Sequence, residues 1–193
     1  MCEDEKSSLK YLKSFKYDEE LKRKLSAVSI EVYHPKNFSP LGLVDEAKAR
    51  MLKARRDRNK YDEIWIVLDR DQHENLPDAL SRANDSNIKV AFSNVCFEFW
   101  VLLHYEKTRK SFYNCSEIIK YIKDNHYPEY QKKDNPFIEL KPRIKIAIEN
   151  AEWFAKQVQL DLDNGMKIHE ISPYTDIHEL IKMLYFPDEF LLN

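Results

Sequence analysis

The feature that most limits how this chain can fold is an uninterrupted apolar run at residues 64–68, with charged residues on both sides. The run is rich in β-branched and aromatic side chains, which is typical of a strand buried on both faces in a parallel sheet. Asp69 and Asp71 follow it. On an extended backbone, residues two apart point to the same side and lie roughly 6 to 7 Å apart. Because open α/β sheets bind ligands beyond the carboxyl ends of their strands, the two carboxylates predict a cation site there. The alternative is an acidic pair in a loop or at a helix N-cap, with no ligand.

Helical and extended patterns alternate along the amino-terminal half of the chain. The helical patterns begin at residues 7, 43 and 74, with Leu21 and Leu25 as a continuation of the first, and the extended patterns cover 27–33, 64–68 and 88–92. This alternation is typical of parallel strands joined by helices. We therefore expect an α/β fold with an open parallel sheet and flanking helices.

Residues 94–105 are apolar nearly all round, which predicts a buried helix. This helix contains one carboxylate, Glu98. A buried glutamate is costly unless it is paired or bound to a cation. Glu98 is therefore either a metal ligand or a partner in a structural hydrogen bond, whereas Trp100 and His104 are expected to belong to the core.

Beyond residue 105 the character of the chain changes to charged helical patterns, at residues 116–123, 141–159 and 177–184. We expect one domain over residues 1–105 and a helical extension over residues 106–193 that packs on it. Thr175 or Asp176 is predicted to cap the last helix, and the alternative is a role near the active site.

Composition excludes several classes of protein. The formal net charge of −2 gives the whole chain no electrostatic footprint for nucleic acid. One local basic cluster remains, either as a solvated helix face that complements the helix dipole or as a phosphate-contacting surface. It comprises Arg50, Lys53, Arg55, Arg56, Arg58 and Lys60. The two glycines of the chain are too few for a Gly-rich phosphate loop.

The cysteine count and the hydropathy pattern bear on the compartment. Three cysteines without Cys-x-x-Cys spacing argue against a disulfide framework and against a zinc site, and they indicate a reducing compartment. No apolar run approaches the roughly 20 residues that span a bilayer. We expect a cytoplasmic protein that does not enter the membrane.

Several segments together resemble one family. They are Cys2-Glu3-Asp4-Glu5-Lys6, Asp69-Arg70-Asp71, the run Ser-Asn-Val-Cys-Phe-Glu-Phe-Trp at 93–100 with Leu102-Leu103-His104, and Pro-Tyr-Thr-Asp-Ile-His at 173–178. This combination resembles the RloB family, which carries a Toprim-type fold. The family includes AbiLii-like components of abortive-infection systems, which are encoded beside an ATPase.

The resemblance implies a role for each acidic residue. Glu3 would act in proton transfer or on a second metal, and Asp69 and Asp71 would hold Mg²⁺ or Mn²⁺. Glu98 would be a further ligand, and His73 would act as a proton shuttle. Carboxylate oxygens suit these hard cations.

The function implied by the resemblance is that of a metal-dependent nuclease, the toxic effector of a phage-defence system that a partner ATPase controls. RNA, with tRNA as one option, is favoured over DNA as the substrate, and a homodimer would be in keeping with Toprim domains. Two alternatives stay open: a non-catalytic scaffold that binds the ATPase or a nucleic acid, and phosphoryl transfer on a small molecule. Two departures from the family favour the scaffold: Asp4 stands where the family usually has Gly, and the apolar strand before Cys2 is almost absent.

Overall fold

The computed structural model describes residues 1–2, 7–24, 30–34, 39–70 and 75–187, and their arrangement is a mixed α/β fold. Its strands are β1 (Trp65–Asp69), β2 (Lys89–Asn94) and β3 (Tyr174–Thr175). Its helices are α1 (Ser7–Tyr17), α2 (Glu19–Lys24), α3 (Pro40–Arg56), α4 (Leu76–Asp85), α5 (Glu98–Leu103), α6 (Cys115–Asn125), α7 (Phe137–Leu140), the 3₁₀ turn η1 (Lys141–Arg143), α8 (Ile144–Asp163) and α9 (Ile177–Tyr185).

The three strands form one open sheet in the order β1-β2-β3. β1 and β2 are parallel, in a register that runs from Trp65 opposite Lys89 to Asp69 opposite Ser93. On the other edge of β1, Cys2 makes an isolated parallel bridge to Val67. The carboxyl ends of β1 and β2 therefore lie at the same edge of the sheet.

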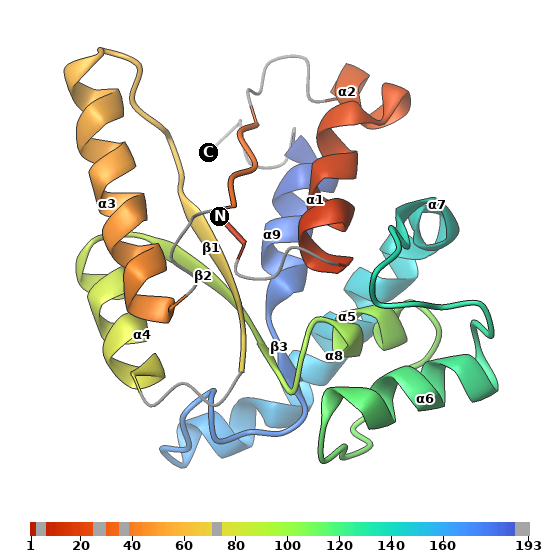
Figure 1. Cartoon of the computed structure of the whole chain (residues 1–193). Coiled ribbons are helices and arrows are strands. Elements are labelled where there is room, and N and C mark those ends of the chain that lie inside the picture. Colours follow the sequence, from red (N-terminus) through yellow and green to blue (C-terminus); the bar gives the residue numbers. More distant parts are fainter. Residues whose placement is uncertain (3–6, 25–29, 35–38, 71–74, 188–193) are drawn as a thin grey trace.

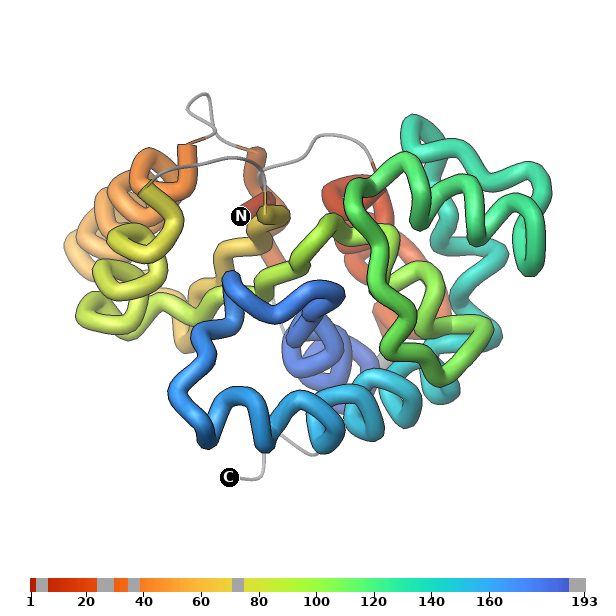
Figure 2. Tube along the Cα trace, turned by 90° about the horizontal axis from the view of Figure 1, so that it is seen from below, coloured from red at the N-terminus to blue at the C-terminus, as the bar shows by residue number. Residues whose placement is uncertain are grey.

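Helices cover both faces of this sheet. Figure 1 shows α3 and α4 together on one side of the strands and α1 and α9 on the other. In the view from below, α3 and α4 lie at one end of the molecule and the segments that hold α6 and α7 at the other (Figure 2). No helix of the described residues is long and apolar enough to cross a bilayer.

Local sequence explains the main elements. The central residues of β1, Ile66 to Leu68, are all buried, which confirms the prediction of a strand covered on both faces. Ser39 begins α3, because its Oγ accepts a hydrogen bond from the Gly42 amide at 3.1 Å, and Pro40 follows at the first helical position. α5 is shorter than the helix predicted over residues 94–105, because Asn94 belongs to β2, but all six of its residues are buried, as the all-round apolar pattern predicts.

Three expectations about the elements need correction. The sheet is not wholly parallel, because β3 pairs antiparallel with β2. That strand comes from the region after residue 105, where only helices were expected. The first helix does not continue to Leu21, because Asp18 accepts hydrogen bonds from the amides of Glu20 and Leu21 and begins the separate helix α2.

The strand expected at residues 27–33 is also not found in its described part. Residues 30–33 belong to no strand, although the Cys2 amide donates to the Tyr33 carbonyl oxygen at 3.1 Å. Residues 27–29 and Leu25 lie outside the described residues. The division at residue 105 stays a prediction, and β3 and α9, which follow that division, both contact β2.

Candidate functional site at the carboxyl edge of the sheet

Asp69 is the last residue of β1 and stands half-buried at the carboxyl edge of the sheet. Its neighbour across the ladder is Ser93, whose carbonyl oxygen accepts a hydrogen bond from the Arg70 amide at 2.7 Å. Because the strand before it is fully packed, the backbone at Asp69 is held in place. The first carboxylate of the Asp-x-Asp pair therefore occupies the position where open α/β sheets bind ligands.

Polar side chains on β2 and β3 surround this edge. Ser93 Oγ and Thr175 Oγ1 lie 3.0 Å apart in a buried hydrogen bond. Asn94 follows Ser93, and its side-chain amide donates to the carbonyl oxygen of Ile171 at 2.6 Å. The Ser93–Thr175 contact connects β2 to β3, and the Asn94 side chain connects β2 to the segment before β3.

Asp176 is the N-cap residue of α9, as predicted, but its side chain makes no capping hydrogen bond. Its Oδ1 instead accepts a hydrogen bond from the Phe92 amide of β2 at 2.6 Å. Burial raises the pKa of this carboxyl to about 7, and the Phe92 hydrogen bond acts against that rise. Asp176 thus completes the sheet next to the candidate site. The Thr175 Oγ1 contact to the Ile177 amide is long, at 3.4 Å.

Glu98 is fully enclosed at the start of α5. Ser7 Oγ and Tyr130 OH both donate to its Oε1 at 2.9 Å. On the other side, Lys132 Nζ lies 3.6 Å from Oε2. Glu98 therefore makes structural hydrogen bonds, which was one of its two predicted roles. Its other predicted role, as a metal ligand, stays a prediction.

A disulfide lies next to Glu98. Cys96 and Cys115 are bonded to each other, and Cys115 Sγ lies 3.1 Å from Glu98 Oε2. A disulfide sulfur carries no proton, so this contact is not a hydrogen bond in the oxidised protein. The argument against a disulfide framework did not foresee this pair, because an odd count still allows one disulfide once the fold brings α6 back to the start of α5.

Among the described residues, one group of side chains could supply three metal ligands. Potential ligand atoms of Cys96, Glu98 and Cys115 lie within 4.8 Å of one another, and Asp69 is not in this group. The other predicted site residues, Glu3, Asp71 and His73, lie outside the described residues, and their roles stay predictions.

Trp100 and His104 belong to the core, as expected. Both are fully buried. His104 Nδ1 lies 2.9 Å from the Trp100 carbonyl oxygen and Nε2 lies 3.3 Å from the hydroxyl of Tyr11. The ring therefore donates through Nδ1 and accepts through Nε2, and burial lowers its pKa to about 3. A neutral histidine with both nitrogens engaged has a structural role.

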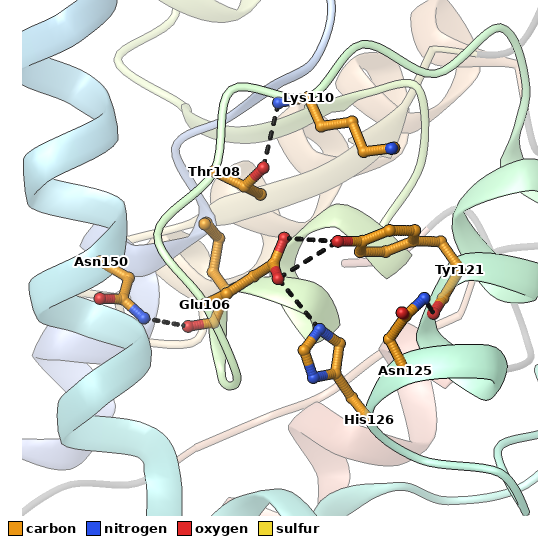
Figure 3. Close-up of polar contacts among 8 residues, drawn as sticks. Glu106, Thr108, Lys110, Tyr121, Asn125, His126 and Asn150 are labelled. Atoms are coloured by element: carbon orange, nitrogen blue, oxygen red, sulfur yellow. Dashed lines mark hydrogen bonds and ion pairs between the residues drawn. The ribbon is translucent and has the colours of Figure 1, made fainter.

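A polar cluster that the sequence reasoning missed joins Glu106, in the loop after α5, to the carboxyl-terminal part of α6 (Figure 3). Glu106 Oε2 is 3.1 Å from His126 Nε2, and the Tyr121 hydroxyl donates to both carboxylate oxygens, at 3.3 and 3.4 Å. The Tyr105 ring stacks on His126 with centroids 5.2 Å apart. No local signal marks this cluster, because Glu106 lies in a loop and its partners Tyr121 and His126 are 15 and 20 residues away in the sequence.

The basic cluster at residues 50–60 divides into two parts. Arg50 is a packing residue, because its Nε lies 3.0 Å from Glu46 and its guanidinium covers the Tyr33 ring at 3.3 Å. The later members are exposed, namely Lys53, Arg55, Arg56, Arg58 and Lys60. A solvated face and a phosphate-contacting surface both fit this exposure.

Comparison with known proteins gives one match. A family model described as RloB-like protein matches residues 1–184. No curated protein and no solved structure gives a significant match. The match covers nearly the whole chain, including Asp69, Glu98 and the segment around Asp176. The chain belongs to the RloB-like family.

Proposed function

We propose that this chain is a metal-dependent nuclease of Toprim type, which cuts RNA, with tRNA as its first candidate substrate, as the toxic effector of a phage-defence system controlled by a partner ATPase. One observation carries the catalytic part: Asp69 ends a buried parallel strand at the edge where such sheets bind ligands, and Asp71 follows two positions later. Membership of the RloB-like family supports the rest.

The chemistry explains why acidic residues are needed. Hydrolysis of a phosphodiester requires neutralisation of developing negative charge and activation of a water molecule, and oxygen-ligated divalent ions do both. Asp69 with Asp71 would hold Mg²⁺ or Mn²⁺, which prefer carboxylate ligands. The half-buried Asp69 fits this role, because it presents an anionic oxygen donor at an edge that also carries Ser93 and Thr175 hydroxyls.

Two further residues would complete the site. Cys2 pairs in parallel with Val67, two residues before Asp69, and this supports Glu3 as the acid that serves proton transfer or a second ion. His73 would carry a proton.

The test compares wild-type protein with Asp69→Asn on total tRNA, single-stranded RNA and plasmid DNA, in Mg²⁺, Mn²⁺ or chelator. Asp62→Asn is the matched control, because Asp62 is an exposed aspartate before the amino end of the same strand. We expect wild type and Asp62→Asn to cut RNA only with metal, and Asp69→Asn to lose the cleavage with an unchanged thermal melt. The assay is repeated with the neighbouring ATPase and ATP, and no cleavage under that condition would favour the scaffold alternative.

A further inference from the structure

We propose that Cys96, Glu98 and Cys115 form a binding site for one thiophilic divalent cation, such as Zn²⁺, once the disulfide between the two cysteines is reduced. The three residues meet where the start of α5 lies against the start of α6. Each offers one ligand atom, and these atoms lie within 4.8 Å of one another. The spacing of the cysteines in the sequence does not predict this cluster, and the cluster is separate from the nuclease site proposed at Asp69.

The donor atoms suit zinc and are already oriented. Zinc binds thiolate sulfur at about 2.3 Å and carboxylate oxygen at about 2.0 to 2.2 Å. Oε1 of Glu98 is occupied by the hydroxyls of Ser7 and Tyr130, each at 2.9 Å. Oε2 is thereby directed to the side of the sulfurs, 3.1 Å from Cys115 Sγ. Hydrogen bonds that fix a ligand in this way are a regular part of metal sites.

Charge balance favours a divalent ion. Two thiolates and one carboxylate carry three negative charges, and Lys132 supplies one positive charge, 3.6 Å from both Glu98 Oε2 and Cys115 Sγ. The remaining charge of −2 is neutralised by the two positive charges of Zn²⁺. In the oxidised protein only Glu98 and Lys132 are charged, so that state is neutral as well. A buried cluster with uncompensated charge would be costly, and both states avoid this cost.

The cluster has a route to solvent. Glu98 is fully buried and Cys96 is 3 % exposed, but Cys115 is only partly buried and the Lys132 side chain is 29 % exposed. Ions and small reductants would enter beside Lys132. Three protein ligands leave the fourth position of a tetrahedral zinc for water.

The change of state balances in atoms and electrons. A dithiol reductant donates two electrons and two protons, the Cys96–Cys115 bond breaks to two thiols, and the reductant becomes a disulfide. On zinc binding, two S–Zn bonds replace two S–H bonds and two protons pass to solvent. Because thiolates are the ligands, binding weakens as the pH falls.

The experiment uses the full chain, reduced and then freed of reductant under anaerobic conditions. It is titrated with Co²⁺ and then with Zn²⁺. We expect one Co²⁺ ion per chain to give a thiolate-to-cobalt charge-transfer absorption, and we expect this absorption to be lost when Zn²⁺ displaces that ion. Cys115→Ser and Glu98→Gln should each weaken binding by more than about 100-fold, since even mutations of outer-shell partners cost about 10- to 100-fold. Cys2→Ser is the matched control, because Cys2 is buried outside the cluster, and it should bind as wild type does.

A second measurement needs no variant. Zn²⁺ should protect Cys96 and Cys115 of reduced wild type from alkylation, as read by mass spectrometry of each cysteine. Absence of Co²⁺ and Zn²⁺ uptake by the reduced, folded wild type would overturn the proposal, as would Co²⁺ binding without a charge-transfer band. Asp69→Asn should retain the zinc site, so the outcome is independent of the nuclease assay.

Discussion

The carboxylate of Asp176 accepts a hydrogen bond from the backbone amide of Phe92 at 2.6 Å, and the Asp176 amide donates to the Phe92 carbonyl oxygen at 3.2 Å. The Asp176 carboxylate thus takes the place of the main-chain carbonyl oxygen that would accept from the Phe92 amide if β3 continued. β2 is therefore held on both sides, by β1 along its length and by Asp176 beyond the end of β3. This contact joins the carboxyl-terminal helix α9 to the sheet that carries Asp69.

The Asp176 contact predicts a pH dependence of stability. Its pKa in the folded protein is raised to about 7 from an ordinary value of 3.8, so the folded state binds the proton more tightly than the unfolded state. The Asp176 contribution to the free energy of unfolding is therefore fully present below about pH 4 and is lost as the pH rises through about 7. Urea unfolding of wild type and Asp176→Asn between pH 4 and 8 measures it.

Asp176→Asn is informative because it keeps an oxygen acceptor for the Phe92 amide but does not titrate. We expect the difference in unfolding free energy between the two proteins to shift in favour of the variant by a few kcal/mol between pH 4 and pH 8, at about 1.4 kcal/mol per unit of pKa. Histidines titrate equally in both proteins and cancel in the difference. A pH-independent difference would contradict the raised pKa.

Much of the fold follows from local sequence. Residues 64–68 predicted β1 because burial on both faces leaves an unbroken apolar run, and the spacing of Leu43, Val44 and Ala47 predicted α3 because one face of that helix is buried. β3 was missed, because two residues carry no periodic pattern and its pairing with β2 depends on residues far apart in the sequence.

The site was predicted less completely. The position of Asp69 follows from the strand that precedes it, and the burial of Glu98 follows from its apolar helix. The partners of Glu98 could not be predicted, because Ser7, Tyr130 and Lys132 are brought to it by chain reversals that leave no local pattern. The Cys96–Cys115 pair and the Glu106–His126 contact escaped for the same reason.

Removal of one donor to Glu98 should destabilise the fold. Tyr130→Phe takes away the hydroxyl 2.9 Å from Oε1 and leaves a buried carboxylate with fewer partners. We expect the free energy of unfolding to fall by about 1.5 to 3 kcal/mol, the range for hydrogen bonds to charged groups. Chemical denaturation measures the loss. A double-mutant cycle with Ser7→Ala should show non-additivity, since both hydroxyls bond one oxygen, and strictly additive losses would argue against a shared acceptor.

The core beneath the site should be sensitive to truncation. Phe99 of α5 is fully buried and packs edge-on against Phe154 of α8, with ring centroids 5.1 Å apart. Phe99→Ala should lower the free energy of unfolding by about 3 to 5 kcal/mol, because it removes apolar contacts and leaves a cavity. Tyr113→Ala is the control, because Tyr113 is 94 % exposed and its removal should change stability by less than about 0.5 kcal/mol. Equal losses in the two variants would contradict this packing.

Substitution of the exposed basic residues after Arg50 would show whether they contact phosphates or only form a solvated helix face. If they contact phosphates, the triple variant of Arg55, Arg56 and Arg58 to Ala should weaken tRNA binding in chelator and flatten its salt dependence by about 0.7 to 0.9 in log–log slope per lost contact, because fewer counterions are released. Arg50 is left in place, because its contact with Tyr33 is structural. A triple variant of Lys13, Lys22 and Arg23 to Ala, exposed residues of α1 and α2, removes the same number of positive charges and controls for the change in net charge. Unchanged affinity and slope in the variant of Arg55, Arg56 and Arg58 would identify the cluster as a solvated helix face that complements the dipole of α3, and an equal effect in the control variant would show that net charge alone is responsible.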